Sequence, residues 1–183
     1  MSALASTAWL ALLLGWMAWG AFSLGLEMPV SLMLGLALGV VCAALFRDSV
    51  PLRGLVAVLG PVGLVLPLLI LRQMAGHLGA PVQPFGSLEL LIFVALYIGF
   101  LACAAGAMPV DFYRVGYAPW PVAIMVLALC ALGFWQGALF LPGLAVAAQA
   151  VWIMGWGSSN WFDHVLHPLL IPAAIIVLIL RLF

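Results

Sequence analysis

Residues 88–108 read LELLIFVALYIGFLACAAGAM, an apolar stretch in which Glu89 is the only charged residue. A run of about 20 apolar residues crosses the hydrocarbon core of a bilayer as a helix, which satisfies its own backbone hydrogen bonds there. The composition of the whole chain agrees, because 68% of its residues are hydrophobic and 5% are charged. A soluble domain has about 25% charged residues. The sequence therefore predicts an all-α, polytopic integral membrane protein.

Similar apolar stretches run almost from one end of the chain to the other, with no long polar linker between them. This continuity predicts a single transmembrane helical domain over residues 1–183. We expect about seven transmembrane helices, at residues 4–26, 29–46, 54–71, 88–108, 118–135, 139–156 and 165–182. The fifth and sixth are short, and only Gln136 and Gly137 suggest a turn between them, so six spans plus a re-entrant hairpin form the alternative.

Most of the few charged residues lie between the predicted spans. All five basic residues are arginines, and seven crossings would place Arg47, Arg53 and Arg114 on one side of the membrane and Arg72 and Arg181 on the other. Because cytoplasmic loops carry the excess of basic residues, this distribution predicts a cytoplasmic N-terminus. From the small size, the arginine-only basic residues and the lack of a sorting signal, we expect the plasma (inner) membrane of a bacterium.

Small residues recur at helical spacing within several predicted spans. Such stripes let helix backbones approach closely, and this close packing holds helices together in lipid. We expect helix packing inside the bundle, with a homodimer contact as the alternative. The residues are Gly35, Gly39 and Ala43 in the second span, Gly99, Cys103 and Ala107 in the fourth, and Gly143 and Ala147 in the sixth.

The predicted third span, residues 54–71, contains Gly60, Pro61, Gly63 and Pro67. A proline inside a helix removes a backbone hydrogen bond and clashes with the preceding turn, so we expect a break in this helix at Gly60, Pro61 and Gly63. Transporters use such breaks to bind an ion or substrate near the middle of the membrane. No ionisable side chain lies in the middle of this span. The sequence therefore favours a structural kink over an ion path.

Polar residues are concentrated in one segment near the C-terminus, residues 157–168, which read GSSNWFDHVLHP. If this segment is helical, Asn160, Asp163, His164 and His167 lie on a single face, because their spacing follows the helical repeat. Imidazole and carboxylate groups are the usual protein ligands of transition metals. We therefore consider Asp163, His164 and His167 as a candidate metal site.

Two other interpretations of this segment remain open. Asn160, Trp161 and His164 could contact a quinone or a lipid headgroup. Alternatively, the segment is an ordinary interfacial turn, in which Ser159 or Asn160 caps a helix and Asp163 lies in its first turn. His77, on the connection after the third predicted span, would reach this segment only in the topology with six spans.

Enzyme motifs give no support for a catalytic function. The sequence contains no HExxH, GxSxG, GxGxxG or P-loop motif, so the familiar hydrolase and nucleotide-binding arrangements have no basis in it. We expect a non-catalytic subunit or small transport component that packs its helices against other membrane subunits or against a second copy, in the lipid bilayer and without nucleic acid. The alternative is a metal, quinone or redox site on Asp163, His164 and His167.

Overall fold

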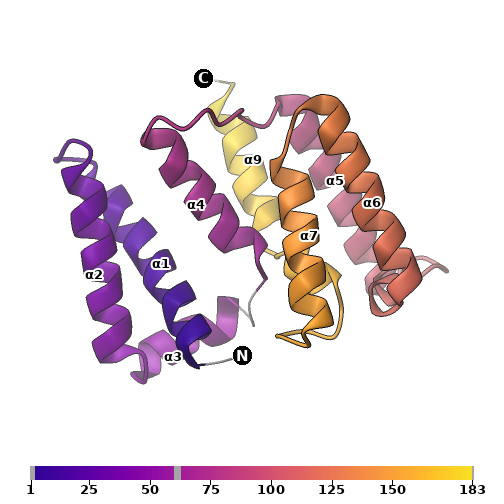
Figure 1. The fold of residues 1–183 in the computed structure, drawn as a ribbon, viewed down its shortest axis with the longest axis horizontal. Helices are drawn as coiled ribbons and strands as arrows, with labels where there is room; N and C mark the ends of the chain where they lie inside the picture. Colours follow the sequence, from indigo (N-terminus) through magenta and orange to yellow (C-terminus); the bar gives the residue numbers. More distant parts are fainter. Residues whose placement is uncertain (1–2, 60–62, 183) are drawn as a thin grey trace. The chain divides into compact units, whose positions relative to one another are not determined.

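The computed structural model describes residues 3–59 and 63–182, and every regular element in this part of the chain is helical. The all-α prediction is therefore confirmed. The chain divides into two compact units, Met1–Val82 and Gln83–Phe183. A single domain over 1–183 stays a prediction. The elements are α1 (Ala3–Phe22), α2 (Val30–Phe46), α3 (Val50–Leu59), α4 (Val65–His77), α5 (Ser87–Ala104), η1 (Tyr113–Tyr117), α6 (Pro119–Gln136), α7 (Phe140–Ile153), α8 (Phe162–Val165) and α9 (Leu170–Leu180) (Figure 1).

In unit 1, α1 and α2 lie side by side with their backbones in close approach (Figure 1). A Cβ atom added at Gly35 would lie 2.6 Å from the backbone nitrogen of Trp19, and one added at Gly39 would lie 2.6 Å from the Cα atom of Gly15. Ala43, one turn further along α2, is completely buried. The small residues of the second predicted span thus lie on the face of α2 that meets α1.

The chain bends sharply after α2. The axes of α2 and α3 make an angle of 108°. Arg47, which follows the last residue of α2, donates a hydrogen bond of 2.8 Å to the hydroxyl of Thr7 and lies 3.6 Å from the carboxylate of Asp48. These contacts tie the corner to α1 and keep its charged groups in a polar environment.

The predicted third span is not one continuous helix. Helix α3 ends at Leu59 and helix α4 begins at Val65, and Gly63 is buried just before α4. Gly60 and Pro61 lie outside the described residues.

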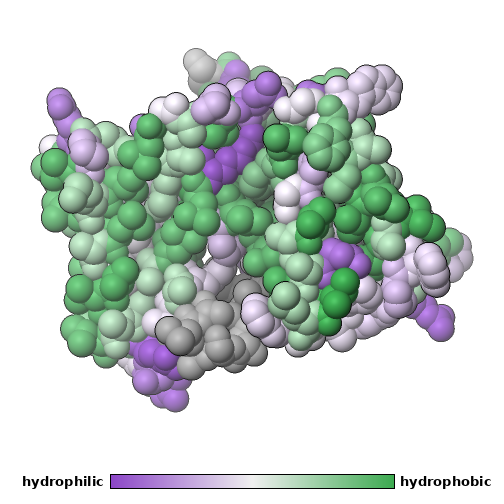
Figure 2. Space-filling view, in the orientation of Figure 1, coloured by the Kyte–Doolittle hydropathy of each residue, from purple (hydrophilic) through white to green (hydrophobic). Residues whose placement is uncertain are grey.

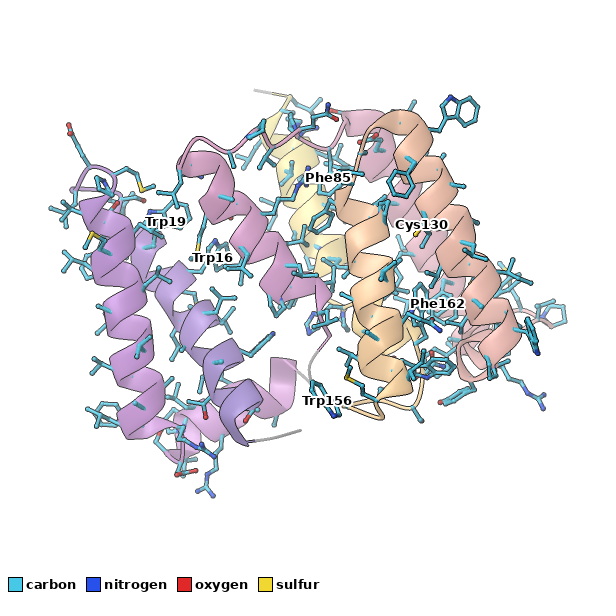
Figure 3. The ribbon with its side chains drawn as sticks, in the orientation of Figure 1. Trp16, Trp19, Phe85, Cys130, Trp156 and Phe162 are labelled. Atoms are coloured by element: carbon cyan, nitrogen blue, oxygen red, sulfur yellow. The ribbon has the colours of Figure 1, made fainter. Side chains whose placement is uncertain are left out.

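Helix α4 continues beyond the predicted end of this span and places polar groups against α1. His77 is the last residue of α4, so its expected position on a connection is wrong. Its ring meets that of Trp19 edge to face with centroids 4.9 Å apart, and the indole of Trp16 donates to the side chain of Gln73 at 2.9 Å. Figure 3 labels both tryptophans on α1. Aromatic and amide groups therefore join α1 to α4 within unit 1.

In unit 2, α6 and α7 form a helical hairpin. Helix α6 ends at Gln136, and Gly137 follows it with a φ of +67°, a conformation that glycine adopts without steric cost. A Cβ atom added at Gly133 would lie 2.5 Å from the Cδ atom of Pro142 in α7. The expected turn at Gln136 and Gly137 is thus present.

Helix α5 pairs with α9 and leaves another of its faces open. The guanidinium group of Arg181 donates to the hydroxyl of Ser87 at 3.0 Å and to the carbonyl of Phe85 at 2.8 Å, which fixes the end of α9 beside the start of α5. A Cβ atom added at Gly99 would meet no atom within 4 Å, and Ala107 is exposed. Unlike Gly35 and Gly39, these two residues are not at a helix contact within their unit.

Fewer helices than expected are long enough to cross a membrane. Within the described residues, three stretches qualify by length and composition: Ser87–Ala104, Pro119–Gln136 and Phe162–Leu180, the last of which combines α8 and α9. The bent pair of α2 and α3 would add a fourth if it counts as one span. Helix α7, with 14 residues, rises only ~21 Å against a hydrocarbon core of ~30 Å. The prediction of seven spans is therefore wrong, because apolar composition does not show where helices bend or end.

The helices expose large apolar side chains over much of their surface. Figure 2 shows hydrophobic residues covering most of the visible face, with hydrophilic ones in small groups. Leu96 on α5 and Leu127 on α6 are both 69% exposed. Apolar surface on this scale is unfavourable in water and favourable in lipid. Three to four helices that are long and apolar enough for a bilayer, with such surfaces, fit a membrane protein.

Candidate ligand-binding site

The polar segment near the C-terminus forms a compact turn rather than a long helix. Helix α8 spans only Phe162–Val165, and Leu166 after it is extended, with φ −118° and ψ 144°. Pro168 disfavours a helical conformation at His167 and has no N–H to donate, so the helix stops before it. The prediction that Asn160 and His167 share one helical face is therefore wrong.

Asp163 accepts hydrogen bonds from two hydroxyl groups. The phenol of Tyr113 lies 3.1 and 3.0 Å from its two carboxylate oxygens, and the hydroxyl of Ser158 donates to one of them. Tyr113 comes from the 3-10 helix η1, 50 residues away in the sequence. The carboxylate therefore joins η1 to the segment around α8.

Asn160 is the centre of this connection. It is completely buried, its amide donates to the carbonyl of Tyr113 at 2.8 Å, and its carbonyl oxygen accepts the N–H of Phe162 at 2.9 Å. The next residue, Trp161, donates its backbone N–H to the carbonyl of Gly116 at 3.0 Å. These hydrogen bonds make Asn160 a structural connection between η1 and the segment around α8. A ligand contact of Asn160 stays a prediction.

Gly116 makes this contact possible. A Cβ atom there would lie 2.7 Å from Cδ2 of Phe162 and would overlap the side-chain oxygen of Asn160. Sequence reasoning missed Gly116, Tyr113 and Ser158. No local pattern marks them, since their partners lie far along the chain or in an irregular turn.

The two histidines are held by local groups. His164 is completely buried, and its Nε2 lies 3.1 Å from the carbonyl of Ser158, which assigns the proton to Nε2 and leaves Nδ1 without a partner. Nδ1 of His167 accepts the N–H of Leu169 at 3.2 Å, at the start of α9. Among the described residues, no three His, Cys, Asp or Glu side chains gather as a metal site. The geometry thus favours a hydrogen-bond network over the metal alternative.

Two clefts of unit 2 meet beside this network. The first, which we call the aromatic cleft, has a volume of about 290 Å³ and is bordered by Asp163. The second, the apolar cleft, has about 490 Å³ and includes Trp161 in its wall. Both are lined by Phe162 and Leu166, so the clefts adjoin. Phe162 is among the side chains labelled in Figure 3.

The aromatic cleft combines aromatic rings with a single charged side chain. The ring centroid of Phe100 lies 4.7 Å from that of Phe162, 6.2 Å from that of Tyr113 and 6.3 Å from that of Tyr97. The remaining lining residues are Leu101, Ala104, Leu166 and Pro168. Asp163 is thus the only charged group in a wall that is otherwise aromatic or apolar, apart from the phenol hydroxyls.

The apolar cleft lies among α5, α6, α7 and α8. Its walls carry no charged side chain, and the indole nitrogen of Trp161 is buried without a hydrogen-bond partner. The lining residues are Phe93 and Leu96 from α5, Met125, Ala128 and Leu129 from α6, Leu141, Leu144 and Ala145 from α7, and Trp161, Phe162, Val165 and Leu166 from the segment around α8. An alkyl chain is the kind of group that such a cleft would bury favourably.

No protein-family model, curated protein or solved structure matches this chain. What the site can do follows from its own groups. A carboxylate and hydroxyls beside aromatic rings suit a polar headgroup, and the adjoining apolar walls suit a hydrocarbon chain.

The network around Asp163 should respond to alkaline pH. Burial, and after it the hydrogen bond to Asp163, raises the pKa of the Tyr113 phenol above its ordinary value. The fold therefore favours the neutral phenol, and its contribution to stability is present below about pH 10 and lost as the pH rises through the folded pKa. We expect Tyr113→Phe to lower the free energy of unfolding by about 1–2 kcal/mol at neutral pH.

Unfolding measured in detergent checks this expectation. The measurement runs from about pH 7 to about pH 11, a range that includes the ordinary tyrosine pKa of about 10. The wild type should lose stability above the ordinary tyrosine pKa more steeply than Tyr113→Phe. Equal slopes for the two proteins would show that Tyr113 does not couple folding to pH.

Proposed function

We propose that this chain is a small multi-pass membrane protein that binds an amphiphilic ligand in unit 2, as a small transport component or non-catalytic subunit of a membrane complex. The observation that carries the proposal is the junction of the aromatic and apolar clefts at Phe162 and Leu166. One cleft offers a carboxylate and hydroxyls, and the other offers only apolar walls. A ligand with a polar head and a hydrocarbon chain complements both.

The proposed location is the plasma (inner) membrane of a bacterium, with lipid as the main partner. Small size and arginine-only basic residues support it, together with the helices that are long enough to cross a bilayer. The cytoplasmic N-terminus depended on seven crossings, so the shorter list of candidate spans removes its basis.

A second candidate function is helix packing against a partner subunit or a second copy of the chain. It is favoured by α5, where Gly99 faces open space while Leu96 and Ile92 beside it are more than half exposed. In lipid, small residues on an uncovered face let another helix approach closely. A Gly99→Leu variant that stays folded but no longer associates would support this candidate.

Filling the apolar cleft tests the proposed function. Ala128 is an exposed residue of α6 in the wall of this cleft, so Ala128→Phe should occupy the space that the ligand chain would take. We expect native mass spectrometry of protein extracted in a mild detergent to show at least about fivefold less bound lipid for this variant, a change of ~1 kcal/mol.

Ala131→Phe supplies the matched control, because Ala131 is also exposed on α6 and does not line the cleft. This variant should retain lipid as the wild type does. Equal retention by wild type, Ala128→Phe and Ala131→Phe, or no bound lipid in any of them, would refute the proposed function.

A further inference from the structure

Asp163 lacks a cationic partner in the described part of the chain. Its carboxylate is bound by the hydroxyls of Tyr113 and Ser158, which donate hydrogen bonds but carry no positive charge. The side chain is half-buried at the wall of the aromatic cleft. A carboxylate withdrawn from water is costly without a counter-charge. The aromatic cleft therefore offers a negative charge that a bound cation would neutralise.

The rings around Asp163 favour the same sign of charge. Aromatic faces carry negative electrostatic potential and attract ammonium groups, most strongly where water is excluded. Phe100 lies at the centre of the ring contacts, with Tyr97, Tyr113 and Phe162 as its neighbours. An anionic headgroup would instead meet a fixed negative charge. The aromatic rings and the carboxylate together favour a positively charged group.

The adjoining apolar cleft indicates which kind of molecule carries this cation. A free organic amine would use the aromatic cleft alone, whereas the headgroup of a membrane lipid brings a hydrocarbon chain that the apolar cleft can bury. Tyr113 and Tyr117, which stack edge to face at 5.7 Å beside the cleft, are residues typical of the membrane interface, the depth of lipid headgroups.

We propose that the aromatic cleft binds the ammonium headgroup of a membrane lipid, with Asp163 as its counter-charge and the acyl chain in the apolar cleft. This inference rests on the proposed function and adds the ligand class. It assigns a binding role to Asp163 that differs from metal ligation, and it leaves Asn160 and His164 as supports of the surrounding turn.

The test compares two lipids with the same acyl chains and different headgroups. Full-length protein in a mild detergent is titrated with phosphatidylethanolamine or phosphatidylglycerol, and bound lipid is counted by native mass spectrometry. We expect the ammonium lipid to bind at least about fivefold more tightly, the order of a ~1 kcal/mol charge and cation–π contribution. Equal binding, or tighter binding of the anionic lipid, would overturn the proposal.

Asp163→Asn removes the charge while keeping an oxygen that can accept the hydroxyls of Tyr113 and Ser158. This variant should lose the headgroup preference and still bind lipid through the apolar cleft. Asp111→Asn is the matched control, because Asp111 is an exposed acid that accepts the backbone N–H of Arg114 and does not line the cleft. A preference that persists in Asp163→Asn, or disappears in Asp111→Asn, would contradict the assignment.

Two further measurements keep the test decisive. If Asp163→Asn fails to fold, Phe100→Leu removes the central ring and leaves the carboxylate in place, and a loss of preference is again expected.

Tetramethylammonium should compete only weakly with the ammonium lipid, and equally tight binding of this free cation would overturn the lipid assignment. Failure of both lipids to bind would reject the proposed function itself, whereas equal binding of both would reject only the headgroup inference.

Discussion

Gly116→Ala should disrupt the turn that borders both clefts. The new methyl group would overlap the side-chain oxygen of Asn160 and approach Cδ2 of Phe162 to 2.7 Å. Asn160, which is completely buried, would have to move, and the part-buried carbonyl of Tyr113 and N–H of Phe162 would lose their hydrogen-bond partner. Each polar group that is left in the protein without a hydrogen-bond partner costs about 1–3 kcal/mol. We therefore expect the free energy of unfolding to fall by about 3 kcal/mol or more.

Unfolding in mixed detergent micelles, followed by circular dichroism, measures this loss. Gly143→Ala is the matched control, because a Cβ atom at Gly143 in α7 would meet no atom within 4 Å and alanine favours helix more than glycine does. The control should be as stable as the wild type or more so. A Gly116→Ala protein with wild-type stability would contradict the close contact of Gly116 with Asn160 and Phe162.

Gly39→Leu should separate α1 from α2. Even a single added carbon at Gly39 would lie 2.6 Å from the Cα atom of Gly15, and leucine adds three more. Backbone atoms cannot give way as a flexible side chain can, so the helices must move apart and lose their close packing. We expect the free energy of unfolding to fall by about 3 kcal/mol or more.

Gly20→Leu provides the comparison for this variant. Gly20 is on α1 itself, and a Cβ atom there would meet no atom within 4 Å. The same residue change should therefore leave the helix pair intact, as judged by thermal unfolding and by resistance to proteolysis. Equal destabilisation at Gly20 and Gly39 would point to a general intolerance of leucine and would contradict close packing at Gly39.

Composition and helical spacing predict much of the fold. The low charge content indicates a helical membrane protein, and the stripe of Gly35, Gly39 and Ala43 identifies the face of α2 that meets α1. Gln136 and Gly137 mark the turn between α6 and α7. These features depend on local sequence, so they can be read without knowledge of distant contacts.

The number of spans could not be predicted in this way. The 108° bend between α2 and α3 does lie at a predicted boundary, beside Arg47 and Asp48. The end of α3 at Leu59 and the start of α4 at Val65 instead lie within one apolar stretch, the predicted span 54–71, so composition does not mark them. A count of apolar stretches therefore overestimates the membrane crossings.

The sequence shows where the candidate site lies but does not predict which of its residues contact one another. Asn160, Asp163, His164 and His167 stand out as polar residues in an apolar chain, and they do lie together in one segment. Their roles depend on η1, about 50 residues earlier, whose Tyr113 binds Asp163. Such long-range hydrogen bonds leave no periodic signal. The predicted helical face consequently fails for His167, which lies between α8 and α9 and belongs to neither helix.

Photocrosslinking tests most directly whether unit 2 holds a lipid. An ammonium phospholipid with a diazirine in its acyl chain is incorporated with the full-length protein into bilayer nanodiscs, irradiated, and mapped by peptide mass spectrometry. We expect labels concentrated on residues of the apolar cleft, such as Met125, Leu129 and Leu144, with labelling reduced in Ala128→Phe. Labels spread evenly over the exposed faces of α2, α5 and α6, unchanged in Ala128→Phe, would contradict it.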